Sequence, residues 1–184
     1  MGVPLRRQPF LVGYQDEALA AGYRALVDKA RDAELDAGGD GRFAKAVAKS
    51  YFKLLSYKDE YEVARLHTRP EFLNSLRTEY GTGARLRFHL APPLLNGKRD
   101  ARGRPLKKEF GAWILPLFRV LAKLRRLRGT AFDVFGYTAE RRMERQLIVE
   151  FEETIERVLA ALRPGTLELA VEVVETFLDI RGFG

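Results

Sequence analysis

The chain has 184 residues, a net charge of +7 and no cysteine. This length fits one domain, and the missing cysteines exclude a disulfide framework, a thiolate zinc site and a cysteine-ligated iron–sulfur cluster within the chain. The longest strongly apolar run, residues 113–118, is far too short to cross a bilayer. We therefore expect a soluble, cytoplasmic protein that makes no membrane contact.

Apolar residues at helical spacing dominate the first half of the chain. They predict a helix over residues 14–35 and a second one whose apolar face runs from Phe43 to Leu55. The breaker-rich residues 35–42 form the loop between them. Ser56 is predicted to cap a short third helix, KDEYEVARL, and Pro70 to open a fourth.

The pattern changes to alternation between residues 85 and 90. Leu86, Phe88 and Leu90 share one face, and polar residues occupy the other, which predicts a strand. Residues 107–110 are predicted to return as a second strand. The two would form a small β-hairpin insertion around 85–110, with a basic turn between them.

Helical spacing resumes at about Trp113, and we expect Trp113 and its neighbouring leucines to lie in the core. The apolar face of this helix is predicted to comprise Leu117, Val120, Leu121, Leu124 and Leu127. Thr138 caps the longest predicted helix, at about 139–163, and Thr166 caps the last. The predicted fold is mainly α, a single domain of six or seven helices with the hairpin inserted.

One triplet invites a cofactor interpretation. Gly39-Asp40-Gly41 matches the start of a thiamine-diphosphate motif, in which the aspartate holds magnesium. The paired asparagines expected some 25 to 30 residues later are absent, because that region is ARLHT. A plain turn between two helices is the better interpretation. The glycine patterns of a phosphate-binding loop and of a dinucleotide-binding turn are also missing.

The other candidate chemical groups favour structural roles. His67 and His89 have no partner at metal-ligand spacing. Asp59, Glu60 and Glu62 could be acid/base carboxylates, but charges at a helix start and salt bridges explain them better. We predict no catalytic residue, no metal site and no cofactor in this chain.

Positive charge is concentrated in the middle of the chain. Residues 85–145 contain 16 Lys/Arg and 5 Asp/Glu, whereas the rest contains 16 and 20. This asymmetry suggests an anionic partner, although a solvated face or pairing with the acidic flanks explains it equally well. The predicted contact surface comprises Arg87, Lys98, Arg99, Arg102, Arg104, Lys107 and Lys108.

Four segments resemble a known enzyme family. They are YKDEYEVARL at 57–66, RLRFHLAPPLL at 85–95, LRRLRGTAFDVFGYTAERRMER at 124–145 and IRGFG at 180–184. Together they are similar to the C-terminal region of the fused bacterial indolepyruvate:ferredoxin oxidoreductases, and the similarity extends over nearly the whole chain.

The resemblance implies a parent enzyme that decarboxylates aryl 2-oxoacids oxidatively to acyl-CoA thioesters and passes the electrons to ferredoxin. Such an enzyme uses thiamine diphosphate, magnesium, iron–sulfur clusters and coenzyme A. The chain would be an excised, non-catalytic C-terminal accessory domain. Its partners would be other domains or subunits of the parent oxidoreductase, with ferredoxin or coenzyme A as further candidates.

A different class of function stays open. Basic residues lie close in sequence to the aromatic loop 132–137, which is typical of modules that bind single-stranded nucleic acid. A stand-alone nucleic-acid-binding module is therefore the alternative, although no nucleic-acid motif supports it.

Overall fold

The computed structural model describes residues 3–81, 83–91 and 106–180, without the side chains of residues 3–6. In this part of the chain it contains eight α-helices and one two-stranded antiparallel sheet, which confirms the mainly α fold with a hairpin. The chain divides into two compact units, Met1–Tyr57 with Gly136–Gly184, and Lys58–Phe135. The prediction that it forms a single domain of a longer enzyme stays a prediction. No helix in the described ranges is long and apolar enough to cross a membrane.

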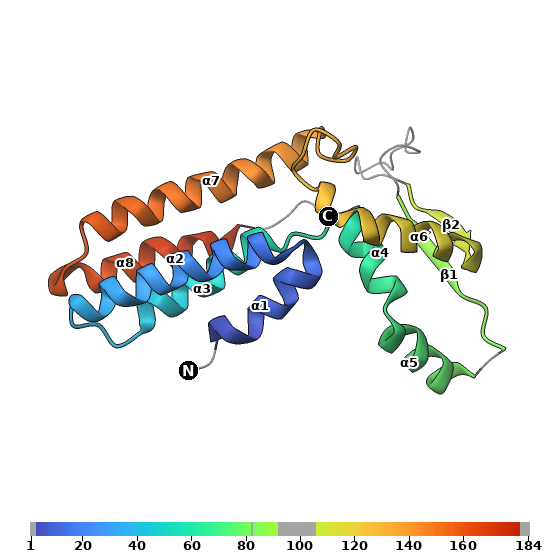
Figure 1. Cartoon of the computed structure of the whole chain (residues 1–184), viewed down its shortest axis with the longest axis horizontal. Helices are drawn as coiled ribbons and strands as arrows, with labels where there is room; N and C mark the ends of the chain where they lie inside the picture. Colours follow the sequence, from blue (N-terminus) through green and yellow to red (C-terminus); the bar gives the residue numbers. More distant parts are fainter. Residues whose placement is uncertain (1–2, 82, 92–105, 181–184) are drawn as a thin grey trace. The chain divides into compact units, whose positions relative to one another are not determined.

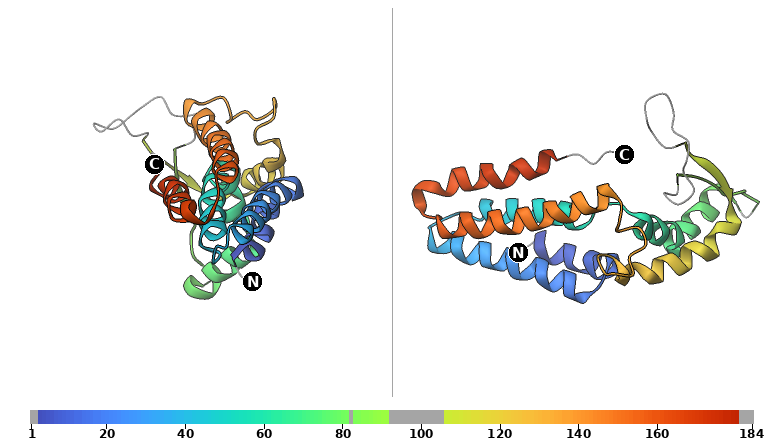
Figure 2. Two further views of the ribbon diagram at one scale, coloured as in Figure 1. Left: turned by 90° about the vertical axis from the view of Figure 1, so that its left-hand side faces the viewer. Right: turned by 90° about the horizontal axis from the view of Figure 1, so that it is seen from above.

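The first unit is a bundle of five helices that run alongside one another (Figures 1 and 2). They are α1 (Val3–Tyr14), α2 (Glu17–Asp36), α3 (Arg42–Leu55), α7 (Ala139–Ala160) and α8 (Leu167–Asp179). Helix α3 lies at the centre and contacts the other four. Its apolar face, from Phe43 to Leu55, is buried as the sequence predicts.

Aromatic rings fill the middle of this bundle. Phe151 of α7 is fully buried and stacks on Tyr51 of α3, and the ring of Phe177 meets it edge-on. Aromatic pairs of this kind contribute about 0.5–1.5 kcal/mol beyond the area that they bury. The apolar stripe predicted for the longest helix therefore faces the core, and Thr138 caps that helix by accepting a hydrogen bond from the backbone of Arg141.

Helix α1 was not among the predicted helices, which accounts for the eighth one. It contains Pro9, and proline inside a helix removes one backbone hydrogen bond and disfavours the helix. Burial outweighs this cost, because Leu11 and Tyr14 are fully buried and Phe10 packs against the same core. The packing of the whole bundle decides the conformation of this segment, not its local propensity.

The turn between α2 and α3 is built around a buried carboxylate. Glu34, in the last turn of α2, is 2% exposed and accepts the backbone N–H groups of Gly41, Phe43 and Ala44 at 2.9–3.0 Å. It thereby caps the N-terminus of α3, where Gly41 offers no side chain. The Gly-Asp-Gly triplet is thus part of an interhelical turn, as favoured above.

The second unit consists of shorter elements. They are α4 (Glu60–Thr68), α5 (Pro70–Tyr80), β1 (Arg87–Leu90), β2 (Lys108–Gly111), a 3₁₀ turn η2 (Ala112–Ile114), α6 (Leu115–Lys123) and a second 3₁₀ turn η3 (Leu124–Leu127). Helix α6 packs against α4, and the hairpin pairs Arg87 with Gly111 and Leu90 with Lys108 (Figure 1). The predicted hairpin is therefore confirmed, although its first strand begins two residues later than predicted and its second strand is shifted by one residue.

Two details of this unit differ from prediction. The third helix is capped by Asp59, not by Ser56, because the Asp59 carboxylate accepts the backbone N–H of Glu62 at 2.8 Å. The predicted face of α6 is also wrong. Ile114 and Phe118 are buried, whereas Trp113 is 69% exposed and the next predicted core leucine, Leu117, is half exposed.

Candidate functional site

The second unit contains a groove of about 620 Å³ that combines apolar and cationic side chains. Helix α5, the segment 81–87, the hairpin and α6 contribute to its walls. Leu73, Leu76, Leu86 and Leu115 supply the apolar surface. Small-molecule sites in proteins are usually 300–1,000 Å³ and join such surface to a few polar groups, and the volume of the groove falls in this range.

Four arginines line the groove, namely Arg77, Arg85, Arg87 and Arg119. The single carboxylate among its lining residues is Glu109, which pairs with Arg87 at 2.9 Å on the neighbouring strand. Both members of this pair are exposed, so the pair contributes little to stability. The groove therefore keeps an excess of positive charge, which attracts anions. Salt screens this attraction with a Debye length of about 8 Å at physiological ionic strength.

The predicted anionic-partner surface is only partly described by the structure. Arg87 lies in the groove, and Lys107 and Lys108 are exposed at the start of β2. The others, Lys98, Arg99, Arg102 and Arg104, lie outside the described residues.

Three of the groove arginines were missed by the sequence prediction. Arg77 lies in the last turn of α5, Arg85 precedes β1 and Arg119 lies on α6. They are up to 42 positions apart in the chain, and only the packing of α5, the hairpin and α6 brings them together. The excess of positive charge in residues 85–145 includes Arg85 and Arg119, whereas Arg77 lies outside that segment and had no signal in the sequence.

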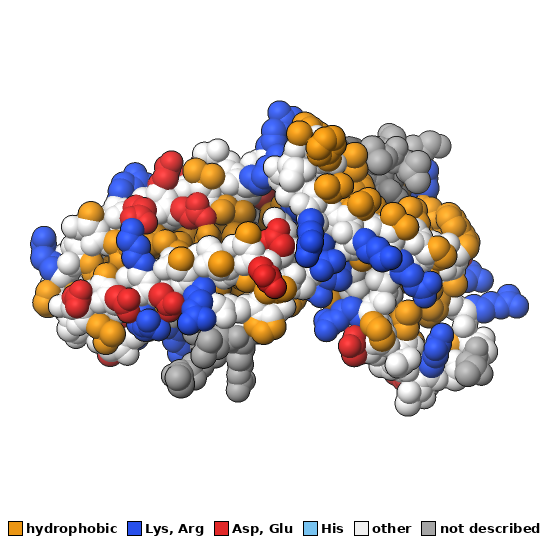
Figure 3. Space-filling model, in the orientation of Figure 1, with side chains coloured by type: hydrophobic (Ala, Val, Ile, Leu, Met, Phe, Trp, Pro, Cys, Tyr) orange, Lys and Arg blue, Asp and Glu red, His pale blue; other side chains and the backbone are white. Residues whose placement is uncertain are grey.

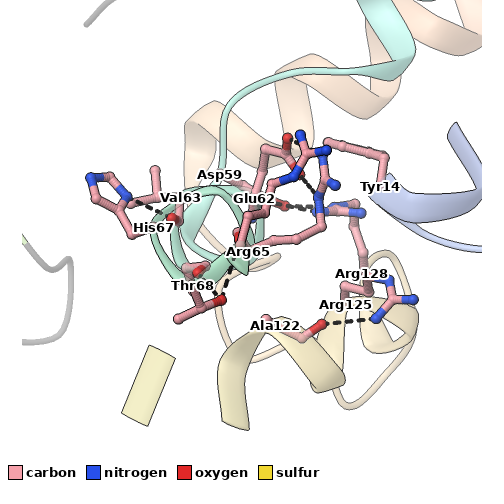
Figure 4. A network of polar contacts seen from close by, with 12 residues as sticks. Tyr14, Asp59, Glu62, Val63, Arg65, His67, Thr68, Ala122, Arg125 and Arg128 are labelled. Atoms are coloured by element: carbon pink, nitrogen blue, oxygen red, sulfur yellow. Dashed lines mark hydrogen bonds and ion pairs between the residues drawn. The ribbon is translucent and has the colours of Figure 1, made fainter. Parts of the chain in front are cut away.

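A buried polar network lies around the start of α4 (Figure 4). The Arg128 guanidinium donates to both carboxylate oxygens of Asp59, at 2.6 and 2.9 Å, and both side chains are less than 5% exposed. The Tyr61 hydroxyl donates to Asp133, whose carboxylate also accepts the backbone N–H groups of Gly129 and Phe135. Burial, followed by the nearby Asp133 charge, raises the pKa of Tyr61 above its ordinary value.

The contacts of this network hold the start of α4 in place. Asp59 caps a helix and holds a buried arginine, and Glu62 pairs with Arg65 at 2.7 Å. Asp59 and Glu62 thus make the helix-start and salt-bridge contacts that the sequence favoured.

The two histidines also occupy structural or surface positions. The ring of His67 packs against Phe72, Phe88 and Phe118, and its Nδ1 lies 2.7 Å from the carbonyl oxygen of Val63. His89 lies on the exposed face of β1, in register with Glu109. Within the described ranges, no three His, Cys, Asp or Glu side chains are grouped in a way that could hold a metal ion.

A family model matches residues 4–184, and its description is a family of unknown function, DUF6537. The chain belongs to the DUF6537 family. No curated protein and no solved structure matches it. The family match covers both units, so the arginine-lined groove and the helical bundle are parts of one family region.

Proposed function

We propose that this DUF6537 chain is a non-catalytic accessory domain of a cytoplasmic enzyme similar to indolepyruvate:ferredoxin oxidoreductase, and that its groove contacts an anionic partner. The observation that carries the docking role is the set of four arginines around an apolar groove with one paired carboxylate. The four sequence segments that resemble the oxidoreductase family support the choice of parent enzyme.

In this proposal the chemistry belongs to other parts of the parent enzyme. Thiamine diphosphate, magnesium, iron–sulfur clusters and coenzyme A would bind there, and this chain would supply packing and electrostatic attraction. The partner at the groove is an acidic face of another domain or subunit, or else ferredoxin or coenzyme A. All of them carry the negative charge that the four arginines would attract.

The proposed parent enzyme is tested by the gene sequence and by an activity assay of the purified chain. The reading frame upstream of residue 1 should encode the thiamine-dependent and γ-like domains of the oxidoreductase. The chain alone, supplied with thiamine diphosphate, magnesium and indolepyruvate, should not reduce a viologen dye. A reading frame without such domains, or reproducible reduction by the pure chain, would contradict the proposal.

The docking role is tested in the full enzyme by reversing groove charges. The double variant Arg77→Glu/Arg119→Glu should raise the KM for ferredoxin or coenzyme A mainly at low salt, or dissociate the assembly if the partner is another domain. The control Lys45→Glu/Arg157→Glu makes the same change in charge on exposed positions of the bundle. If both KM values and the assembly are unchanged in the groove variant, docking at the groove is wrong.

One observation favours the nucleic-acid alternative. Phe132 is 76% exposed and follows a stretch that contains Arg125 and Arg126, and exposed aromatics beside cations can stack single-stranded bases. The purified chain would then bind a single-stranded oligonucleotide with an affinity that falls steeply with salt. Phe132→Ala should weaken that binding.

A further inference from the structure

Helix α6 and its flanking turns carry an exposed row of apolar side chains. Trp113, Leu117, Val120 and Leu124 are 69%, 51%, 53% and 40% exposed. Their spacing is four, three and four residues, and at about 100° per residue they fall within an arc of about 60°. Figure 3 shows apolar side chains gathered along α6 with a row of Lys and Arg beside them. We refer to these four residues as the α6 stripe.

The stripe is separate from the other two faces of the helix. Ile114 and Phe118 point into the core of the second unit, and Leu121 packs against the same cluster. Leu115 and Arg119 line the groove on another side. The stripe therefore lies outside the buried core and the groove lining, and its Trp113, in the turn η2, meets the ring of Phe110 edge-on. Contiguous exposed apolar surface of this kind marks an interaction site in soluble proteins.

The width and spacing of the stripe favour a helix as its occupant. A spacing of four, three and four residues is that of the a and d positions in a heptad, which form a narrow seam between two helices. A helix that lies on a membrane needs a wider apolar face. The stripe spans 12 residues from Trp113 to Leu124, and these correspond to about three helical turns of a partner.

The charge around the stripe defines the chemistry of that partner. Residues 110–127 include four Lys/Arg and no Asp/Glu. By helical geometry Lys123 lies along one border of the stripe, and Arg119 lies beyond it on the groove side. Residues that flank a heptad seam select partners through charge, and complementary charge accelerates association. A partner with acidic residues beside its apolar seam would be attracted, whereas a basic one would be repelled.

We propose that the α6 stripe is a docking seam for an acidic amphipathic helix, about three turns long, of a partner protein. This inference does not depend on the proposed parent enzyme or on the ligand of the groove. A seam of four side chains is smaller than the roughly 800 Å² that each partner contributes to a standard stable interface. The isolated contact is therefore weak, and in a larger assembly it would select the partner and its orientation.

Trp113 makes the seam directly observable, because it is the only tryptophan in the chain. The probe is a 14-residue helical peptide with leucines at a and d positions and glutamates beside them. Its addition to the full chain should shift the Trp113 emission to shorter wavelength in a saturable way. One control peptide carries lysines in place of the glutamates, and another carries serines in place of the leucines. Neither should bind within tenfold of the affinity of the first.

Two variants separate apolar packing from charge. Leu117→Ser/Val120→Ser should weaken binding of the glutamate peptide at least tenfold while the circular dichroism stays unchanged, since both positions are exposed. Lys123→Glu should weaken binding of the glutamate peptide and strengthen binding of the lysine peptide. The control Val149→Ser, at an exposed position of α7, should leave the affinity for both peptides as it is.

Every other pattern of results overturns the proposal. If the Trp113 emission shows no saturable shift at peptide concentrations up to about millimolar, the stripe is not a docking site for this helix. If the glutamate and lysine peptides bind equally well, the stripe does not select its partner by charge. A shift that needs phosphatidylglycerol vesicles instead of peptide assigns the stripe to a membrane. A shift that depends on protein concentration without peptide, together with a dimer in size-exclusion chromatography, assigns it to a second copy of the chain.

Discussion

The buried carboxylate of Glu34 provides the sharpest test of the fold. In Glu34→Ala, the N–H groups of Phe43 and Ala44 lose their acceptors inside the protein. Each buried donor without a partner costs about 1–3 kcal/mol, and the lost negative charge at the N-terminus of α3 adds about 0.3–1 kcal/mol. A cavity of about 200 Å³ beside Glu34 can admit water to these groups. We therefore expect a loss near the lower end of the sum, about 3 kcal/mol.

Gly39 offers a second route to the same interaction. A Cβ atom at this position would lie 2.3 Å from Cγ of Glu34, so the carboxylate would have to move. The backbone of Gly39 is not in the left-handed region, and alanine can adopt it without strain. Gly39→Ala should thus cost about 2 kcal/mol when Glu34 is present, because it disturbs charge-assisted hydrogen bonds of about 1.5–3 kcal/mol each. In the Glu34→Ala background it should cost almost nothing.

Urea unfolding followed by circular dichroism measures both effects. Asp36→Ala is the matched control, because Asp36 is an exposed carboxylate in the same turn of α2. Its effect should stay within about 0.5 kcal/mol, as for most surface substitutions. The double-mutant cycle of Glu34 and Gly39 should give a coupling energy of about 2 kcal/mol. Additive effects, or a loss below about 1 kcal/mol for Glu34→Ala, would refute the capping role.

Three further outcomes follow from the buried groups. Arg128→Ala should destabilise the chain by about 3–5 kcal/mol in urea unfolding, since it leaves the Asp59 carboxylate buried without its partner; a loss below 1 kcal/mol would contradict this. Phe151→Ala should lower the free energy of unfolding by about 3–5 kcal/mol. The exposed control Val149→Ala should lower it by less than about 0.5 kcal/mol. Equal losses would show that the apolar face of α7 does not face the core. Burial, and then the hydrogen bond to a neighbouring carboxylate, raises the pKa of Tyr51 above its ordinary value of 10.0. Folded protein therefore keeps this proton where unfolded protein loses it, so stability should fall above about pH 10, by up to about 1.4 kcal/mol per pH unit, and Tyr51→Phe should flatten that fall.

The fold class was predictable because the bundle helices have strong one-sided patterns. The apolar positions of α3 and α7 recur at helical spacing and face the core, and the alternation of residues 85–90 defined the first strand of the hairpin. The cap of α3 was not predictable, because its carboxylate comes from a different helix. Propensity also gave the wrong answer for α1, where tertiary packing outweighs the effect of Pro9.

The face of α6 shows a different limit of sequence reasoning. Apolar residues of α6 and its flanking turns occur on several sides of the helix, so periodicity alone was compatible with more than one buried face. The predicted stripe, with Leu117 and Val120, turned out to be the exposed one, whereas Phe118 is buried. The groove was hidden for a related reason: the sequence shows an excess of arginine, but only the packing of the second unit shows which arginines share a wall.

The groove and the α6 stripe share a helix, and this allows their occupants to be distinguished. Arg119 lines the groove, whereas Lys123 borders the stripe. If one acidic partner covers both surfaces, Arg119→Glu and Lys123→Glu should each weaken its binding, and their combined effect should depart from additivity because the two charges meet the same surface. If the groove holds a small anion and the stripe holds a helix, Arg119→Glu should weaken only the binding of the anion, and Lys123→Glu should weaken only the binding of the helix. Binding of an acidic helical peptide and of coenzyme A to the unmodified chain, the two single variants and the double variant distinguishes one continuous interface from two separate sites.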